Sequence, residues 1–169
     1  MIFVDIDDLN WKQIFRSWLQ TKQELGEEYV EHIQDCANRY IEPILKHKAL
    51  ACNEIVLTSD IACIRNMTVL FDAVEHNYAD AKAQMSTEDF LPLVEKWFVF
   101  SIIWSVGATV DELGRKELDL IFRDIEPMFP TMNTVFDYHI NMQKKDWEPW
   151  EAKLAQQNFK GKEFHELYV

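Results

Sequence analysis

FLPLVEKWFVFSIIWSV, residues 90–106, is the stretch that decides the fold. It is apolar on nearly every side, and its aromatic and β-branched residues are typical of either a buried strand or a buried helix. Ser86 followed by Asp89 resembles a helix-capping pair, and Gly107 is a natural stop signal. Because this length and these end signals suit a helix, the sequence predicts one buried helix at the centre of the core.

Amphipathic helices are expected on the N-terminal side of this stretch. Apolar residues at helical spacing predict them over 11–19, 27–46 and 61–74. We expect Asp7 or Asp8 to cap the first helix, because their carboxylates accept hydrogen bonds from free backbone N–H groups. Pro43 lies late in the second helix and predicts a break or kink there.

The C-terminal side is predicted to end the helices and begin a β-hairpin. Thr109 is expected to cap a helix that ends before Pro127, with a buried side formed by Leu113, Leu118, Ile121, Phe122 and Ile125. Apolar and polar residues then alternate over 135–140, a polar turn follows, and Pro149 restricts the second strand to an edge. The predicted fold class is mainly α: a helical bundle over 1–126, with a linker, β-hairpin and connector over 127–169.

Composition favours a packed helical module and excludes several kinds of partner. The 169 residues carry a formal charge of −12, and 48% of them are hydrophobic. So acidic a chain is not expected to bind nucleic acid or an anionic membrane surface. The longest apolar run, within 97–106, has about ten residues and falls short of the ~20 that a membrane-spanning helix needs.

Motifs of catalysis and of metal binding are not found in the sequence. The chain has four glycines and no GxxxxGK[ST] or GxGxxG loop. Its histidines (His32, His47, His76, His139 and His165) are scattered without evident ligand spacing, and its cysteines (Cys36, Cys52 and Cys63) fit no CxxC pair. We expect reduced, buried thiols in a cytosolic protein, with no catalytic residue and no metal ligand.

Three residues leave an alternative open. Trp147 and Trp150 form either an aromatic binding platform or packing contacts against the neighbouring helices. Arg115, just inside a predicted helix, either senses a phosphate group or forms a surface ion pair with Asp111 or Asp119.

The sequence closely resembles dynein heavy chains in five stretches taken in order. The two most specific are FVFSIIWSVGATVDELGR at 98–115 and TVFDYHINMQKKDWEPW at 134–150. Residues 1–19, the IVLTSD at 55–60 and the FHELYV at 164–169 also resemble segments of that family, although Leu57 replaces an expected proline. The WSVG form and the DY–WxPW hairpin look more like axonemal dyneins, and we lean to an inner-arm heavy chain.

The resemblance implies a position in the motor ring. The matching stretches are similar to the small lid subdomain of the second AAA+ module together with its connector to the third. In such lids a sensor arginine often lies where Lys96 or Trp97 stands here, and neither is an arginine. With Arg115, these residues are the candidates for contact with a nucleotide. The candidates for structural coupling are Phe98, Phe100, Trp104, Gly107, Asp137, Tyr138, Trp147 and Trp150.

The function that follows from the resemblance is mechanical. The chain would be a non-catalytic piece of a very large ATP-driven microtubule motor, relaying movements between the neighbouring AAA+ large subdomains of the same heavy chain. ATP or ADP with Mg would bind in the parent protein and not in this piece, and microtubules and dynein subunits would be partners through the parent only. The expected location is the cytoplasm, the cytoskeleton and the ciliary axoneme. The alternative is a free-standing helical adaptor that binds other proteins.

Overall fold

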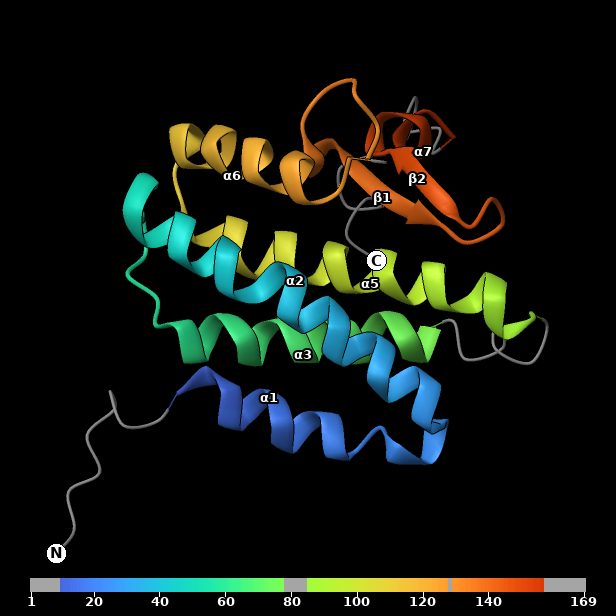
Figure 1. Cartoon of the computed structure of the whole chain (residues 1–169). Coiled ribbons are helices and arrows are strands. Elements are labelled where there is room, and N and C mark those ends of the chain that lie inside the picture. Colours follow the sequence, from blue (N-terminus) through green and yellow to red (C-terminus); the bar gives the residue numbers. More distant parts are fainter. Residues whose placement is uncertain (1–9, 78–84, 128, 157–169) are drawn as a thin grey trace, which may run out of the picture.

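The computed structural model describes residues 10–77, 85–127 and 129–156. They form a bundle of helices with a small antiparallel hairpin on one side, near the C-terminal end (Figure 1). This arrangement confirms the predicted fold class. The family-like segment at 164–169 lies outside the described residues, as do Asp7 and Asp8, the expected caps of the first helix.

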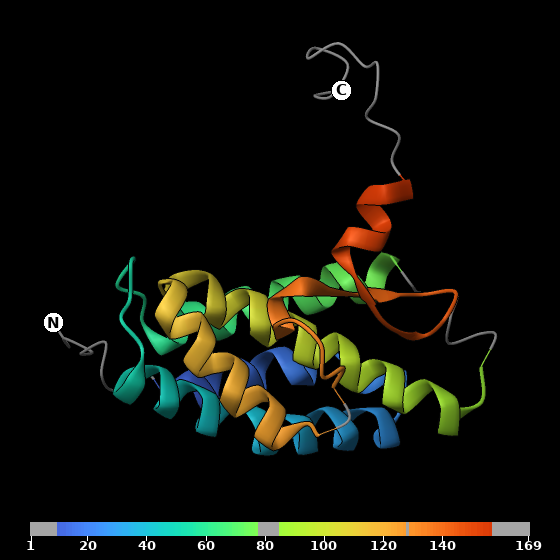
Figure 2. The ribbon, with the colours of Figure 1, turned by 90° about the horizontal axis from the view of Figure 1, so that it is seen from above.

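The apolar stretch forms helix α5 (Thr87–Val106), which lies between two layers of the molecule (Figures 1 and 2). One side of α5 contacts α2 and α3, and its other side contacts strand β1 and a short turn of 3-10 helix, η4 (Val135–Asp137). The Ser86 hydroxyl caps the helix by accepting from the backbone N–H of Asp89. Burial on both sides explains why this helix is apolar all round.

By length and composition, the segment Glu88–Thr109 also meets the test for a helix that could cross a membrane. Within the part of the chain that the structure describes, it is the one segment that does so. Two-thirds of its most apolar window (67%) is buried inside the molecule. The apolar side chains of α5 therefore face other helices of the same chain, as in the core helix of a globular bundle.

Helices α1 (Trp11–Gln20), α2 (Glu27–Ala51) and α3 (Asp60–Asn77) form the layer on one side of α5. Asn10 is the residue that caps α1. The tight entry into α2 uses Gly26 at φ +112°, a conformation that L side chains rarely adopt. Of the break or kink predicted at Pro43, the break is wrong, because α2 continues through Pro43 to Ala51.

Helix α6 (Glu112–Ile125) packs against α2. The predicted cap at Thr109 is wrong: Asp111 caps α6 by accepting from the backbone N–H of Gly114 at 2.7 Å. Thr109 instead donates its hydroxyl to the carbonyl of Val106. Leu118 and Phe122 are buried as predicted, whereas Leu113 is 70% exposed.

The hairpin consists of β1 (Tyr138–Asn141) and β2 (Asp146–Pro149), paired antiparallel with Ile140 opposite Trp147. It begins later than the alternation predicts, since residues 135–137 form η4 instead of strand. A short helix, α7 (Trp150–Gln156), follows directly and was not expected from the sequence.

Candidate functional site

Lys96, a candidate for nucleotide contact, holds the hairpin against α5. Its ammonium group donates to the carboxylate of Asp146 at 2.7 Å and to the carbonyl of Lys145 at 3.0 Å. Partial burial of Asp146 acts in the opposite direction, but hydrogen bonds from Lys96 and from the backbone N–H of Trp147 lower the pKa of that carboxyl. Lys96 is thus engaged in a contact between two elements.

Trp97 and Phe98 belong to the core of the bundle. Trp97 is 1% exposed, and its ring meets Phe71 and Phe90 edge-on, with centroids 6.5 and 5.7 Å away. Phe98 is fully buried and packs against Phe15 of α1. These contacts join α5 to α1 and α3 in the first layer, and they leave Trp97 no surface on which a nucleotide could stack.

Phe100 and Trp104 lie on the opposite face of α5. Just after the helix ends, Gly107 lies close to the connector. Phe100 lies 6.4 Å from Trp104, whose ring meets Phe136 edge-on at 6.1 Å. A Cβ atom at Gly107 would stand only 2.2 Å from the Phe136 ring. Glycine is therefore required at position 107 by this contact.

Arg115 does not form the predicted ion pair with Asp111 or Asp119. Its guanidinium lies over the Phe136 ring, 5.7 Å from the centroid, which is a cation–π geometry. Asp111 caps α6 and Asp119 pairs with Arg123, so neither of the proposed acidic partners is paired with Arg115. Arg115 thus covers the aromatic contact between α5 and η4.

The linker after α6 is fixed by Arg123, for which the sequence predicted no role, and by Asp119, which was considered there only as a partner of Arg115. Arg123 pairs with Asp119 one turn earlier and donates to the carbonyls of Pro130 and Asn133, the latter at 2.7 Å. Asp119 also accepts from the backbone N–H of Val135 at 2.7 Å. The i, i+4 spacing of the pair was visible in the sequence, but its reach across the linker was not.

Asp137 and Tyr138 complete this fixation at the start of the hairpin. The Asp137 carboxylate accepts from both the backbone N–H and the hydroxyl of Thr134, at 2.8 and 2.7 Å. Tyr138 donates its hydroxyl to the carbonyl of Met132 at 2.8 Å, and its ring meets Phe129 edge-on at 5.5 Å. Both residues act within the connector.

Trp147 and Trp150 make packing contacts. Trp147 lies against Phe129 of the linker, with ring centroids 4.4 Å apart, and Trp150 lies against His139 at 4.6 Å. The Lys153 ammonium lies over the Trp150 ring at 5.3 Å. The two tryptophans have separate neighbours, so they do not form one shared platform.

A groove of about 340 Å³ lies between α5, the end of α6 and the hairpin. Its lining residues are Pro92, Glu95, Lys96, Val99, Glu126, Asp146 and Trp147. The carboxylates outnumber the single ammonium, which is already paired with Asp146. Such a lining is unfavourable for the phosphates of a nucleotide.

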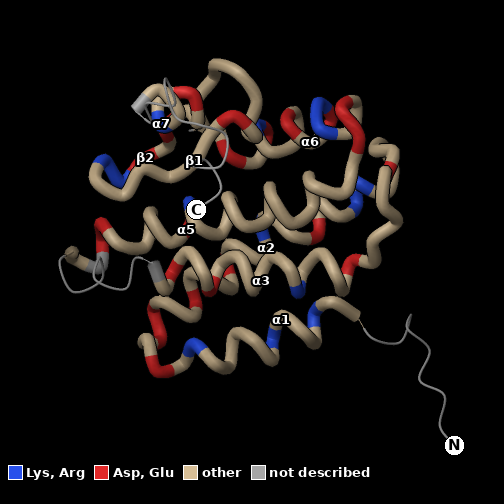
Figure 3. Tube along the Cα trace, turned by 180° about the vertical axis from the view of Figure 1, so that it is seen from behind, with Lys and Arg blue, Asp and Glu red and all other residues tan. Residues whose placement is uncertain are grey.

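Charge and exposed apolar side chains are distributed differently over the described surface. Figure 3 shows Lys and Arg scattered among Asp and Glu along the helices, without a continuous basic face. Exposed apolar residues gather where α2 ends and α6 begins, because the backbone of Ile55 is hydrogen-bonded to that of Thr109. We call this group the apolar end; it consists of Leu50, Ile55, Val56, Leu57 and Leu113, all more than 60% exposed.

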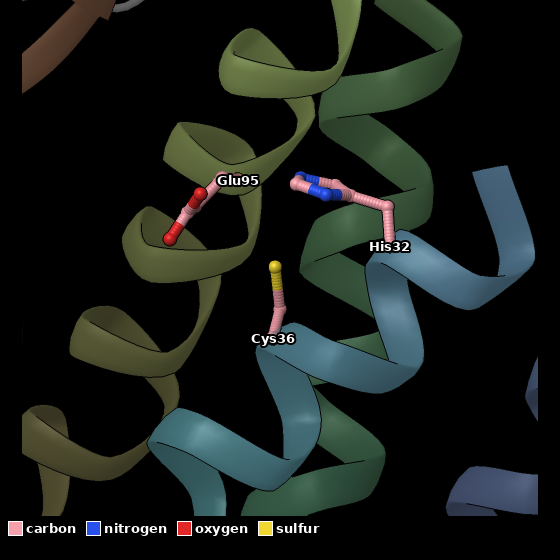
Figure 4. Close-up of side chains that lie close together, drawn as sticks. All are labelled: His32, Cys36 and Glu95. Carbon is pink, nitrogen blue, oxygen red and sulfur yellow. The ribbon is translucent and has the colours of Figure 1, made fainter. Parts of the chain in front are cut away.

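One cluster of ligand-type side chains was missed in the sequence. Cys36 lies one turn after His32 in α2, and Glu95 faces both residues from α5 (Figure 4). Their nearest ligand atoms all lie within 4.8 Å of one another. The His-x3-Cys spacing was visible, so the description of the histidines as lacking ligand spacing is incomplete; the third residue depends on how the helices pack.

Comparisons with known proteins agree on one family. A family model described as the dynein heavy chain AAA lid domain matches residues 33–152. Mouse dynein axonemal heavy chain 2 is 36% identical over 159 residues, covering 91% of this chain. The dynein-1-beta heavy chain of the flagellar inner arm I1 complex from Chlamydomonas reinhardtii is 31% identical and covers 92%.

The chain spans only a small part of these relatives, 3% of the mouse protein and 4% of the algal one. The match nevertheless includes the buried helix α5, the aromatic contacts around Gly107 and the hairpin. The chain therefore belongs to the dynein heavy chain AAA lid domain family.

Proposed function

We propose that this chain is the lid and connector between the second and third AAA+ modules of an axonemal dynein heavy chain. In this role the helices over residues 1–126 cover one side of a nucleotide pocket built elsewhere in the heavy chain, and residues 127–169 lead to the next module. ATP or ADP with Mg would bind in that pocket. The parent would move along microtubules in the axoneme of cilia, within the cytoskeleton.

The attachment of the connector to the bundle at several points is the observation that carries this proposal. The hairpin is attached to α5 through Lys96 and Asp146, and the linker is attached to α6 through Arg123. Aromatic contacts at Phe136 and Phe129 fill the space between these attachments. A movement of the bundle therefore carries the hairpin with it, which is what a rigid-body relay requires.

The apolar end supports a neighbour on that side of the bundle. Exposed apolar groups such as Leu57, at 91% exposure, are unfavourable in water and favour burial against another surface. A large subdomain of the same heavy chain is the neighbour that this proposal implies. An inner-arm heavy chain is our preferred parent, in keeping with the inner-arm complex named for one relative.

A non-catalytic role predicts that the chain alone binds nucleotide poorly. Lys96 is occupied by Asp146, Trp97 is buried, and the groove beside them is acidic. Calorimetric titration with Mg-ATP and Mg-ADP should give no binding in the micromolar range. Micromolar binding would overturn this part of the proposal.

The relay is tested in a heavy chain that carries this segment. Lys96→Met combined with Arg123→Ala should slow microtubule gliding while ATP turnover persists, because the connector is loosened and no catalytic group is touched. Lys116→Met is the matched control, since Lys116 pairs only with Glu112 on the exposed face of α6. Unchanged gliding in the double variant would contradict the relay.

In the alternative role, the chain is a free-standing adaptor that binds a partner protein through the same apolar end. A transcript that encodes a phosphate loop before Met1 and a PTxDT run after Val169 would exclude it. A messenger RNA that encodes this chain alone would instead favour the adaptor and exclude the relay.

A further inference from the structure

His32, Cys36 and Glu95 lie outside every contact that the proposed relay uses. His32 and Cys36 project from the same face of α2 towards α5, where Glu95 stands opposite them (Figure 4). Cys36 is fully buried, and the other two side chains are half-buried. The Nε2 atom of His32 is shielded from solvent and has no hydrogen-bond partner among the described residues. A buried imidazole nitrogen without a partner is an unusual arrangement that a bound ligand would resolve.

We propose that His32, Cys36 and Glu95 bind a zinc-class divalent cation between α2 and α5. Imidazole nitrogen, thiolate sulfur and carboxylate oxygen are the three ligand types that Zn²⁺ takes in proteins. A thiolate and an imidazole do not suit Ca²⁺ or Mg²⁺, which prefer oxygen ligands. Three protein ligands leave a fourth tetrahedral position, which water can take because His32 and Glu95 are only half-buried.

The Glu95 carboxylate is already held in place by a second set of groups. One of its oxygens, Oε1, accepts from the guanidinium of Arg39 and, at 2.7 Å, from the hydroxyl of Tyr40. No bond to the other oxygen, Oε2, is recorded among the described residues, so it is available as a ligand. Outer-shell hydrogen bonds of this kind orient ligating carboxylates and strengthen metal sites.

Distances allow the site to close by side-chain rotation. Ligand atoms about 2.0–2.3 Å from a tetrahedral metal ion lie about 3.5 Å from one another. The ligand atoms here are within 4.8 Å, so a contraction of about 1 Å assembles the site.

The cation brings two positive charges to a site whose anionic ligands are the Cys36 thiolate and the Glu95 carboxylate, the latter already paired with Arg39. Burial raises the pKa of the Cys36 thiol to about 12, so the incoming ion must displace the thiol proton, which passes to the solvent.

Cobalt(II) and zinc(II) salts, added to the 169-residue chain, test the site. Co²⁺ should bind one per chain with the near-ultraviolet charge-transfer band of a thiolate ligand, and excess Zn²⁺ should remove that band. Cys36→Ser should abolish it, and His32→Gln and Glu95→Gln should weaken Co²⁺ binding at least tenfold. Zn²⁺ should also raise the thermal midpoint of the wild-type chain.

Cys63→Ser is the matched control. Cys63 is a fully buried thiol like Cys36, but it lies near Lys48 and outside the cluster. It should keep the band and the thermal shift. If Cys36→Ser fails to fold by circular dichroism, His32→Gln carries the test, since that side chain is half-buried. No band in the wild type, or a band of equal strength in a folded His32→Gln, would overturn the proposal, whichever way the relay experiment turns out.

Discussion

Lys96 on α5 and Asp146 at the start of β2 are 50 residues apart in the sequence and form an ion pair of 2.7 Å. This pair joins the central helix to the hairpin. The Asp146 carboxylate is largely exposed, so the pair should contribute little to the free energy of unfolding. Its importance is that it fixes where the hairpin lies against α5.

Lys96→Met should loosen the hairpin without unfolding the bundle. Because exposed ion pairs contribute about 1 kcal/mol or less, the free energy of unfolding should fall by no more than that. Hydrogen exchange of the amides in β1 and β2 should become several-fold faster, while amides of α3 keep their rates. Equal acceleration in Lys116→Met would show that the effect is not specific to this contact.

Acid should release the same contact. The folded-state pKa of Asp146 lies below its ordinary value of 3.8, so the stabilisation is fully present above that value. It is lost as the pH falls through the lowered folded-state pKa. A carbon chemical-shift titration of the Asp146 carboxyl should give a midpoint below 3.8 in the wild type and a higher one in Lys96→Met. A wild-type midpoint above 3.8 would contradict this.

Gly107→Ala should destabilise the junction between α5 and η4. The added methyl group would overlap the Phe136 ring, and overpacking of this kind costs about 1–3 kcal/mol. Urea denaturation measures the loss. Adding Phe136→Leu should recover part of the lost free energy of unfolding, because the smaller side chain no longer overlaps the new methyl group. If the losses of the two single variants simply add in the double variant, the steric cause is ruled out.

Arg123→Ala should free the linker after α6. It removes two hydrogen bonds to backbone carbonyls and leaves Asp119 without its partner, at a cost of about 1–3 kcal/mol in the free energy of unfolding. Urea denaturation of Lys116→Ala, which alters an exposed pair on the same helix, provides the comparison. Similar losses in the two variants would argue against a special role for Arg123.

The apolar end should cause weak self-association. Sedimentation at increasing concentration should show a growing dimer fraction, and Ile55→Asp with Leu57→Asp should reduce it, because both side chains are more than 60% exposed. A monomer at every concentration would refute this expectation.

Local signals explain what the sequence could predict. The Ser86 cap, the apolar stretch of α5 and the alternation before the hairpin all depend on residues close together in the chain. The helix does not break at Pro43 because packing overrides a local signal. The neighbouring residues Ile41, Ile44 and Leu45 are buried, and their burial offsets the hydrogen bond that proline cannot donate.

Contacts between distant segments account for what the sequence could not predict. Asp111 and Thr109 are both good capping residues, and Asp111, which caps α6, also accepts a hydrogen bond from Asn53 in another part of the chain. Glu95 joins His32 only through the packing of α5 on α2. Neither pairing has a periodicity that a single sequence reveals.

The position of α5 between two layers has a thermodynamic consequence. It packs against α2 and α3 on one side and against β1 and η4 on the other, so loss of either layer exposes apolar side chains of α5 to water. Residues 11–126 and the hairpin should therefore melt together in one calorimetric transition, with equal calorimetric and van't Hoff enthalpies. The division of the chain at residue 126 then describes two parts of a single cooperative unit.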